Sequence, residues 1–93
     1  MPNYIRKTFK HLIIYDKDNT TKLTDVYLSK YEDVHAYIVK NFPAYDCPVS
    51  ILKAIVNKIH ISSKYDSIVP FIKLNLVLKQ DIPKYSIIIN NYH

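Results

Sequence analysis

Apolar side chains recur every three or four residues between positions 29 and 62, which is the spacing of one face of a helix. Pro43 and Pro48 divide this stretch, because proline disfavours helical geometry at the residue before it and is tolerated at a helix start. The pattern therefore predicts two short helices. The first has a buried stripe of Tyr31, Val34, Ile38 and Phe42. The second has a buried stripe of Ile51, Leu52, Ile55 and Ile59.

Both predicted helices begin with a capping signal. Ser29 followed by Glu32 fits a capping box, in which the hydroxyl accepts the N–H three residues on and the carboxylate accepts the N–H of the cap. Pro48 suits the first position of the second helix, because its missing N–H has no partner there. We therefore expect Asp46 or Cys47 to cap the second helix.

Alternating apolar and polar residues predict strands on either side of the helices. Residues 8–15 carry apolar side chains on both faces, so this strand is expected to be central or covered. The polar run 16–22 is a turn that leads into a second strand at 23–28. Residues 72–79 alternate regularly, which places one side on the core and one in solvent, and a final strand is expected at 85–90.

The order of these elements, ββααββ, predicts an α+β fold. Hairpins make antiparallel neighbours, so the expected architecture is a four-stranded, mostly antiparallel sheet built from two hairpins, with two helices packed on one face. The alternative is a sheet split into its two hairpins, one of them completed by a partner or a second copy. Residues 1–93 are expected to form a single domain.

The chain is basic, with a formal net charge of +5 and 12 lysines against a single arginine. A positive balance favours acidic partners, either nucleic acid or an acidic protein surface. Arginine supplies the bidentate fork that reads guanine, so base-specific recognition is not expected. An AT-rich genome explains the same composition, because it favours Ile, Lys, Asn and Tyr and disfavours glycine, and this alternative stays open.

The sequence contains no glycine, which excludes several enzyme classes. Phosphate-binding loops, dinucleotide fingerprints and the nucleophile elbow use glycine where the backbone needs positive φ or a close approach. The apolar runs are too short for a membrane span, and the amino terminus lacks the apolar segment of a signal peptide. A single cysteine, Cys47, cannot form an internal disulfide and is expected to be half-buried and structural. We therefore expect a cytoplasmic protein without membrane contact.

A short acidic motif follows the first predicted strand. Residues 12–15 are apolar and lead into the segment DKDNT, which begins at Asp16. It resembles the first motif of haloacid-dehalogenase-like phosphatases, an apolar strand ending in Asp-x-Asp-x-Thr. The resemblance implies Asp16 as nucleophile and Asp18 as acid/base. A polar hairpin turn explains the same residues and is favoured here, so no enzymatic activity is predicted.

The potential metal ligands are scattered along the sequence. His11, His35, His60, His93 and Cys47 stand singly, and no two of them have the spacing of a ligand pair. We therefore predict neither a metal site nor a cofactor.

Two polar surfaces are candidates for binding. One is a mostly basic stripe opposite the apolar stripe of the second helix, and the other is the solvent face of the third predicted strand, extended across the following turn. A solvated helix face explains the first of these surfaces and is favoured there over a binding surface. The candidate binding residues are Lys53, Asn57, His60, Lys64, Lys73, Asn75, Lys79 and Lys84.

These features favour a small non-enzymatic binding protein. The first hypothesis is a phage- or virus-type accessory inhibitor, acting in the host cytoplasm, that occludes an acidic surface on a host nucleic-acid-handling or defence protein, in the manner of an anti-CRISPR protein. The alternative is sequence-nonspecific binding of nucleic acid, in which lysines contact phosphates and tyrosines stack on bases. Core packing explains most of those tyrosines as well, notably Tyr15, Tyr27, Tyr31 and Tyr37. A subunit or structural role would predict a homodimer through an unpaired hairpin edge.

Overall fold

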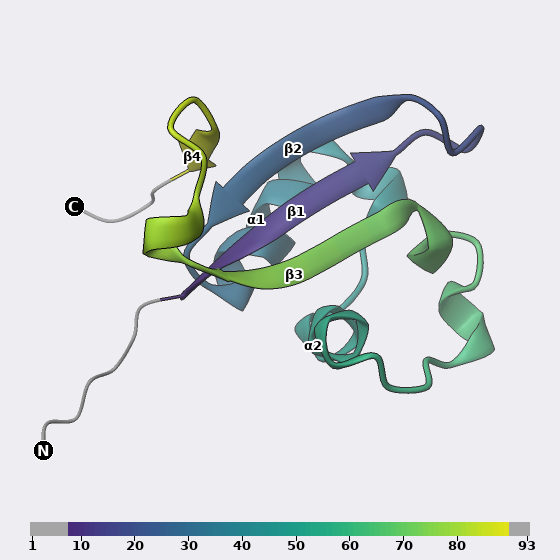
Figure 1. Cartoon of the computed structure of the whole chain (residues 1–93). Helices are drawn as coiled ribbons and strands as arrows, with labels where there is room; N and C mark the ends of the chain where they lie inside the picture. Colours follow the sequence, from purple (N-terminus) through teal and green to yellow (C-terminus); the bar gives the residue numbers. More distant parts are fainter. Residues whose placement is uncertain (1–7, 90–93) are drawn as a thin grey trace, which may run out of the picture.

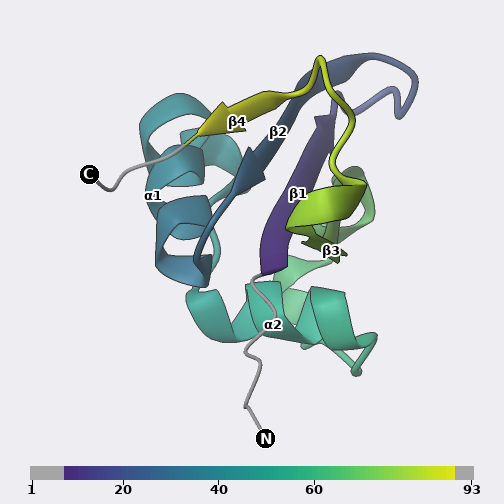
Figure 2. The same cartoon turned by 60° about the vertical axis from the view of Figure 1, so that its left-hand side comes forward.

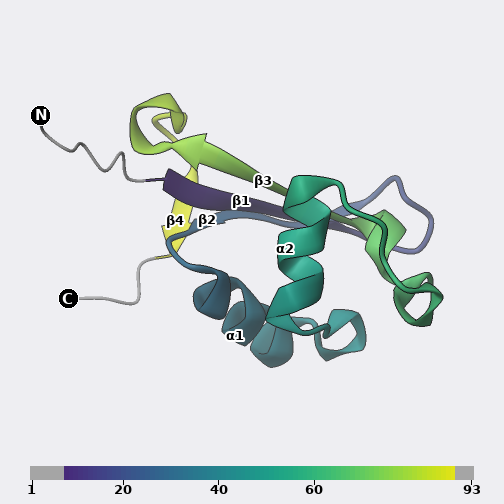
Figure 3. The same ribbon diagram turned by 90° about the horizontal axis from the view of Figure 1, so that it is seen from below.

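The computed structural model describes residues 8–89, which form a four-stranded mixed sheet with two helices on one of its faces (Figures 1 and 3). The strand order is β3-β1-β2-β4. The predicted α+β class, the order of elements and the mostly antiparallel pairing are confirmed for this part of the chain. The elements are β1 (Thr8–Tyr15), β2 (Lys22–Leu28), α1 (Tyr31–Asn41), α2 (Val49–Asn57), β3 (Ile72–Leu78) and β4 (Ile87–Ile89).

The first strand lies in the interior of the sheet, as its two apolar faces predict. β1 pairs antiparallel with β2 on one side and with β3 on the other. Leu12 and Ile14 point toward the helices and are completely buried. Each fully buried side chain of this size contributes about 1.5–3 kcal/mol relative to leaving it in water.

The β1–β2 hairpin turn spans residues 16–21 and is held by its own polar groups. The N–H of Asp16 donates to the carbonyl of Thr21 at 2.8 Å. The carboxylate of Asp18 accepts the N–H groups of Thr20 and Thr21 at 2.9 and 3.2 Å. Asn19 adopts φ 58°, a left-handed conformation that asparagine tolerates better than most residues. The predicted polar turn is confirmed.

The buried stripe of α1 is confirmed, but its start lies one residue later than the capping pattern predicts. Val34 and Ile38 are fully buried. The helix cap is Lys30, whose N–H donates to the carboxylate of Asp33 at 3.2 Å. Ser29 is instead buried in front of the helix, where its carbonyl accepts a hydrogen bond from the Lys10 ammonium at 3.0 Å. The predicted box of Ser29 and Glu32 is therefore wrong.

The second helix is shorter than predicted at both ends. Its cap is Pro48 rather than Asp46 or Cys47, and the helix ends at Asn57. Lys58 takes the left-handed conformation at φ 57°, which turns the chain away. Leu52 is fully buried as predicted, whereas Ile59 lies beyond the helix and is 58% exposed.

The predicted second hairpin does not form. β4 crosses to the far edge of the sheet and pairs with β2 in parallel, in the register Val26 with Ile87 and Leu28 with Ile89. The eight-residue connection 79–86 begins with a short 3-10 helix at Lys79–Asp81. Residue 90, the last of the predicted strand, lies outside the described residues.

The sheet has two different faces (Figure 3). The covered face packs on α1 and α2, and together they form one core that includes Leu12, Leu28 and Leu74. On the open face, the connection 79–86 passes over the end of the sheet where β1 begins (Figure 2). Phe9 and Tyr27 are also buried, although alternation places them on the open face, and the ring of His11 stacks on that of Tyr27 there. Among residues 8–89, neither helix is long and apolar enough to cross a membrane.

Candidate binding surfaces

All eight candidate residues predicted from the sequence lie on the surface, but they do not form one site. Lys53 and Asn57 are one turn apart on α2 and share an exposed helix face. The predicted continuation of that stripe is wrong, because the helix ends before His60 and Lys64. His60 lies in the loop after α2, and Lys64 lies in the short 3-10 helix Ser63–Tyr65.

The remaining four candidates belong to the sheet side of the molecule. Lys73 and Asn75 are exposed on the open face of β3, because the alternate residues Ile72 and Leu74 face the core. Lys79 follows in the short helix after β3. Lys84 lies in the same connection, just before β4. The structure thus places Lys53 and Asn57 on a helix and Lys73 and Asn75 on a strand, and the eight candidates are spread over several elements.

Several lysines are engaged with aromatic rings. The ammonium of Lys73 lies 5.4 Å from the ring centre of Tyr15, and that of Lys64 lies 5.8 Å from the ring centre of Tyr65. Lys53 contacts the ring of Tyr31 at 5.6 Å. These distances are within the range of cation–π attraction.

The sequence pattern did not indicate which tyrosines are accessible. Among the tyrosines of residues 8–89, only Tyr85 is largely in water, with 94% of its surface exposed. Tyr27 and Tyr45 are buried. Tyr37 donates or accepts a hydrogen bond with the hydroxyl of Thr24 at 2.7 Å. Base stacking would therefore have to begin at Tyr85 or displace lysines from the half-buried rings.

A polar cluster on the open face was not found from the sequence. Nε2 of His11 lies 2.6 Å from a carboxylate oxygen of Asp25, and the imidazole stacks on Tyr27. The other carboxylate oxygen accepts from the Lys22 ammonium at 3.0 Å. Burial acts to raise the pKa of the Asp25 carboxyl, but the hydrogen bonds from His11 and Lys22 outweigh it and leave that pKa below its ordinary value. Only the strand register brings these residues together.

The acidic motif after β1 serves the turn. The backbone hydrogen bonds from Thr20 and Thr21 lower the pKa of Asp18, because they favour the ionised carboxylate. The strand that precedes Asp16 turns back antiparallel into β2, whereas the resemblance implies a strand of a parallel sheet. The phosphatase role of Asp16 and Asp18 thus lacks its structural context.

Cys47 is almost completely buried rather than half-buried as predicted, and this burial agrees with a structural role. Burial, with a smaller contribution from the charge of Asp46, raises the pKa of its thiol to about 11. A reactive thiolate needs the opposite shift. In residues 8–89, no three His, Cys, Asp or Glu side chains gather in a way that could hold a metal ion.

The largest feature missed by the sequence pattern is an apolar cluster at the β4 edge of the sheet. Tyr85, Ile87 and Ile88, called here the edge patch, expose 94%, 61% and 46% of their surfaces. Ile87 is paired with Val26 and lies with it on the covered face of the sheet. Ile88 is paired with Tyr27 and lies with it on the open face. The edge patch therefore presents apolar side chains on both sides of the strand.

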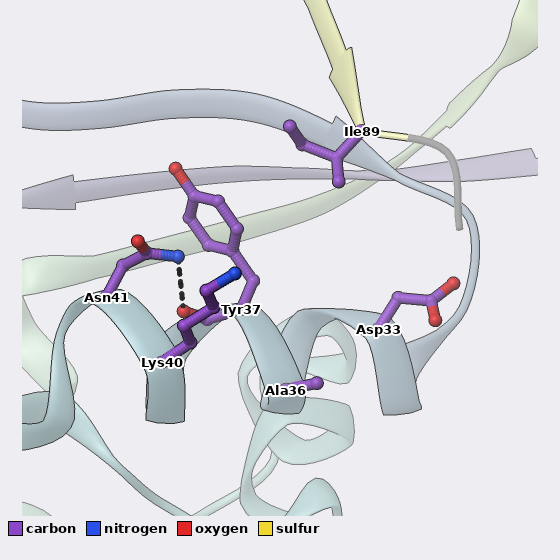
Figure 4. Close-up of a pocket in the computed structure, with 6 residues that line it drawn as sticks. All are labelled: Asp33, Ala36, Tyr37, Lys40, Asn41 and Ile89. Atoms are coloured by element: carbon purple, nitrogen blue, oxygen red, sulfur yellow. Dashed lines mark hydrogen bonds between the residues drawn. The ribbon is translucent and has the colours of Figure 1, made fainter.

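A small cavity of about 290 Å³ lies beside the edge patch, between Ile89 and α1 (Figure 4). The helix lines it with residues that do not belong to the buried stripe of α1. Asn41 donates its side-chain N–H to the carbonyl of Tyr37 at 3.1 Å, which fixes one wall. The lining residues are Asp33, Ala36, Tyr37, Lys40, Asn41 and Ile89.

Comparison with known proteins gives no family to which these surfaces can be assigned. No family model, no curated protein and no solved structure matches the chain.

Proposed function

We propose that the chain is a small binding protein that occludes a surface on a partner protein of acidic character. In its most specific form, the proposal is a phage- or virus-type accessory inhibitor of a host nucleic-acid-handling or defence protein, comparable to an anti-CRISPR protein. The observation that carries the proposal is the edge patch, because it exposes three large apolar side chains at the β4 edge of the sheet.

Contiguous exposed apolar residues are typical of surfaces that bind other proteins. A tyrosine beside branched aliphatic residues supplies rigid contact area, and such anchors dominate the free energy of many interfaces. Tyr85 is preceded directly by Lys84, and the adjacent cavity is lined by Lys40 and by Asp33, whose carboxylate already accepts the N–H of Lys30. The edge patch thus has an apolar centre with two lysines and one aspartate around it.

The charge of the chain supports an acidic partner. A net charge of +5 on 93 residues attracts a negatively charged surface and raises the rate of encounter. The burial of the apolar edge patch would then hold the complex. Charge would thus speed the encounter and apolar burial would stabilise the complex, which suits a protein that acts by covering a surface on its partner.

Binding of nucleic acid remains the alternative hypothesis. It draws on the lysines that face outward from β3 and from the connection after it, together with Tyr85. It depends on phosphate contacts, so its affinity must fall steeply with salt, with a slope of about −0.9 per phosphate contact on duplex DNA.

The deciding experiment measures both modes with two matched variants. The first variant replaces Lys73, Lys79 and Lys84 by glutamine, and the second replaces Tyr85 and Ile88 by serine. Binding of labelled single- and double-stranded DNA and RNA is measured across a salt titration. Capture of protein partners is measured after nuclease treatment.

Under the proposed function, one stoichiometric protein survives nuclease treatment and is lost with the serine variant. Oligonucleotides bind weakly or not at all to the wild type. Tight, salt-steep oligonucleotide binding that is lost with the glutamine variant would contradict the proposal and establish the alternative.

A further inference from the structure

The strand β4 has the side-chain pattern of an interior strand but lies at the edge of the sheet. Ile87, Ile88 and Ile89 are apolar on both sides of the strand, a pattern found where strands are covered on both faces. Edge strands are ordinarily protected by charged residues, prolines or bulges, which discourage pairing with another chain. None of these lies within Ile87–Ile89.

The opposite edge of the sheet shows how this fold protects a strand. There, α2 packs against β3, and the C-terminal part of the helix lies beside the strand (Figures 1 and 3). Lys73 and Asn75 also make the open side of β3 polar. Within residues 8–89, a helix lies beside β3 but not beside the outer edge of β4, so β4 is the edge of this part of the chain that is available for pairing.

The cavity beside β4 lies where an added strand would need space. Neighbouring strands lie about 4.8 Å apart, so a strand added next to β4 would point alternate side chains toward α1. The cavity is walled by Ile89 on one side and by the outer residues of α1 on the other (Figure 4). Its volume of about 290 Å³ is at the lower limit for small-molecule sites and fits a side chain.

We propose that the β4 edge accepts an extended acidic segment of a partner protein as a fifth strand. The partner's backbone pairs with β4, one of its apolar side chains enters the cavity, and the alternate carboxylates point to the open side, where the connection 79–86 carries Lys84. This inference rests on the proposed function, since it names the mode of binding and the chemistry of the partner segment.

Charge favours an acidic segment over a second copy of this chain. Two copies would each bring a net charge of +5 to the contact. An acidic segment meets the cations at the rim of the edge patch instead of repelling them.

The test uses the full chain and a short capped peptide in which glutamate and valine alternate. Two peptides serve as controls: one has the same composition with the glutamates grouped together, and one has lysine in place of glutamate. Binding is measured by fluorescence anisotropy, and its location by chemical-shift changes and amide hydrogen exchange.

The variants are matched by exposure. Ile87→Glu adds a negative charge at the edge patch, and Ile59→Glu makes the same change at an isoleucine of similar exposure, 58% against 61%. Ala36→Phe fills the cavity, and Ala44→Phe adds the same ring at another exposed alanine. Circular dichroism establishes that each variant is folded before its binding is compared.

We expect the alternating acidic peptide to shift the resonances of β4 and of the cavity residues and to slow exchange of β4 amides. Ile87→Glu and Ala36→Phe should each weaken binding by about tenfold or more, which corresponds to about 1.4 kcal/mol. The two control variants should stay within about twofold of the wild type.

Three results would overturn the inference. They are equal binding of all three peptides, resonance shifts away from β4, and a concentration-dependent dimer that forms through β4. If no peptide binds but Ile87→Glu still abolishes capture of a nuclease-resistant protein partner, strand addition is wrong and the proposed function stands. If the wild type captures no nuclease-resistant protein partner either, strand addition and the proposed function are both wrong.

Discussion

The imidazole of His11 is held between two residues of the neighbouring strand, with Nε2 at 2.6 Å from Oδ1 of Asp25 and its ring centre at 4.2 Å from that of Tyr27. The two rings are within 7° of parallel. Asp25 also binds Lys22, so the open face of the hairpin carries a connected polar cluster. Its residues fasten β1 to β2 beyond the backbone hydrogen bonds of the sheet.

This cluster predicts an acid-sensitive contribution to stability. The pKa of Asp25 is lowered in the folded state, so its contribution is present above the unfolded value of 3.8 and is lost as the pH falls through the folded value. Asp25→Asn should lower the Tm at neutral pH by an amount that corresponds to at most about 1 kcal/mol, because the side chain is 39% exposed. Thermal melts from neutral pH to below 3.8 should show the difference shrinking. Asp66→Asn, at an exposed aspartate, is the control.

The buried thiol of Cys47 predicts a loss of stability at alkaline pH, whereas Asp25 predicts one at acidic pH. The pKa of its thiol is raised from 9.0 to about 11, so the stabilising difference is fully present below pH 9.0 and is lost as the pH rises toward 11. Cys47→Ala should remove this part of the alkaline loss of stability. The native thiol should react with iodoacetamide far more slowly than the thiol of the urea-unfolded chain. Equal rates in the two states would contradict the burial of Cys47.

The end of α2 predicts a stabilising glycine in a chain that has none. Lys58 adopts φ 57° and ψ 40°, a left-handed conformation that costs a non-glycine residue roughly 1 kcal/mol or more. Lys58→Gly should therefore raise the free energy of unfolding by about 0.5–1 kcal/mol. Lys53→Gly, inside the same helix, should lower it by about 1 kcal/mol. Urea denaturation of both variants measures these changes, and a loss of stability in Lys58→Gly would count against the helix end described above.

The attachment of α2 to the sheet depends on Leu52, which is the fully buried residue of that helix. Leu52→Ala should lower the free energy of unfolding by about 2–5 kcal/mol, because it removes buried methyl groups and leaves a cavity. Ile59→Ala, at a 58% exposed position, should change it by less than about 0.5 kcal/mol. Denaturant titration compares the two, and equal effects would mean that Leu52 is not a core residue.

Much of the fold could be predicted because neighbouring residues carry the information. Strands 8–15, 23–28 and 72–79 follow from alternation, and the buried stripe of α1 follows from helical spacing. These patterns report which side of an element meets the core, and that depends on a few consecutive residues. The start of each helix was displaced by one residue, since tertiary contacts such as the Lys10 bond to Ser29 compete with local capping. The second helix also ends at least three residues earlier than predicted.

The eight candidate residues are exposed, as predicted. The polar cluster around His11 and the edge patch were not predicted. The stacking of His11 on Tyr27 depends on the register between β1 and β2, which no local pattern fixes to one residue. The run Ile87–Ile89 was predicted to belong to a final strand, but nothing in its local pattern indicated which edge it would take. Its exposure became evident only from its position at the edge.

The sequence by itself determined the α+β class, the order of the elements and the basic surface, because periodicity, turn residues and charge are local properties. Only the tertiary structure decided which edge receives the last strand. The connection 79–86 carries β4 across the open face to β2 instead of turning it back on β3. Every free strand edge offers the same backbone donors and acceptors, so local sequence does not decide which edge a distant strand joins. Here α2 already packs against β3, and the last strand pairs with β2 at the other edge. That outcome created the edge patch and the cavity on which the functional proposals rest.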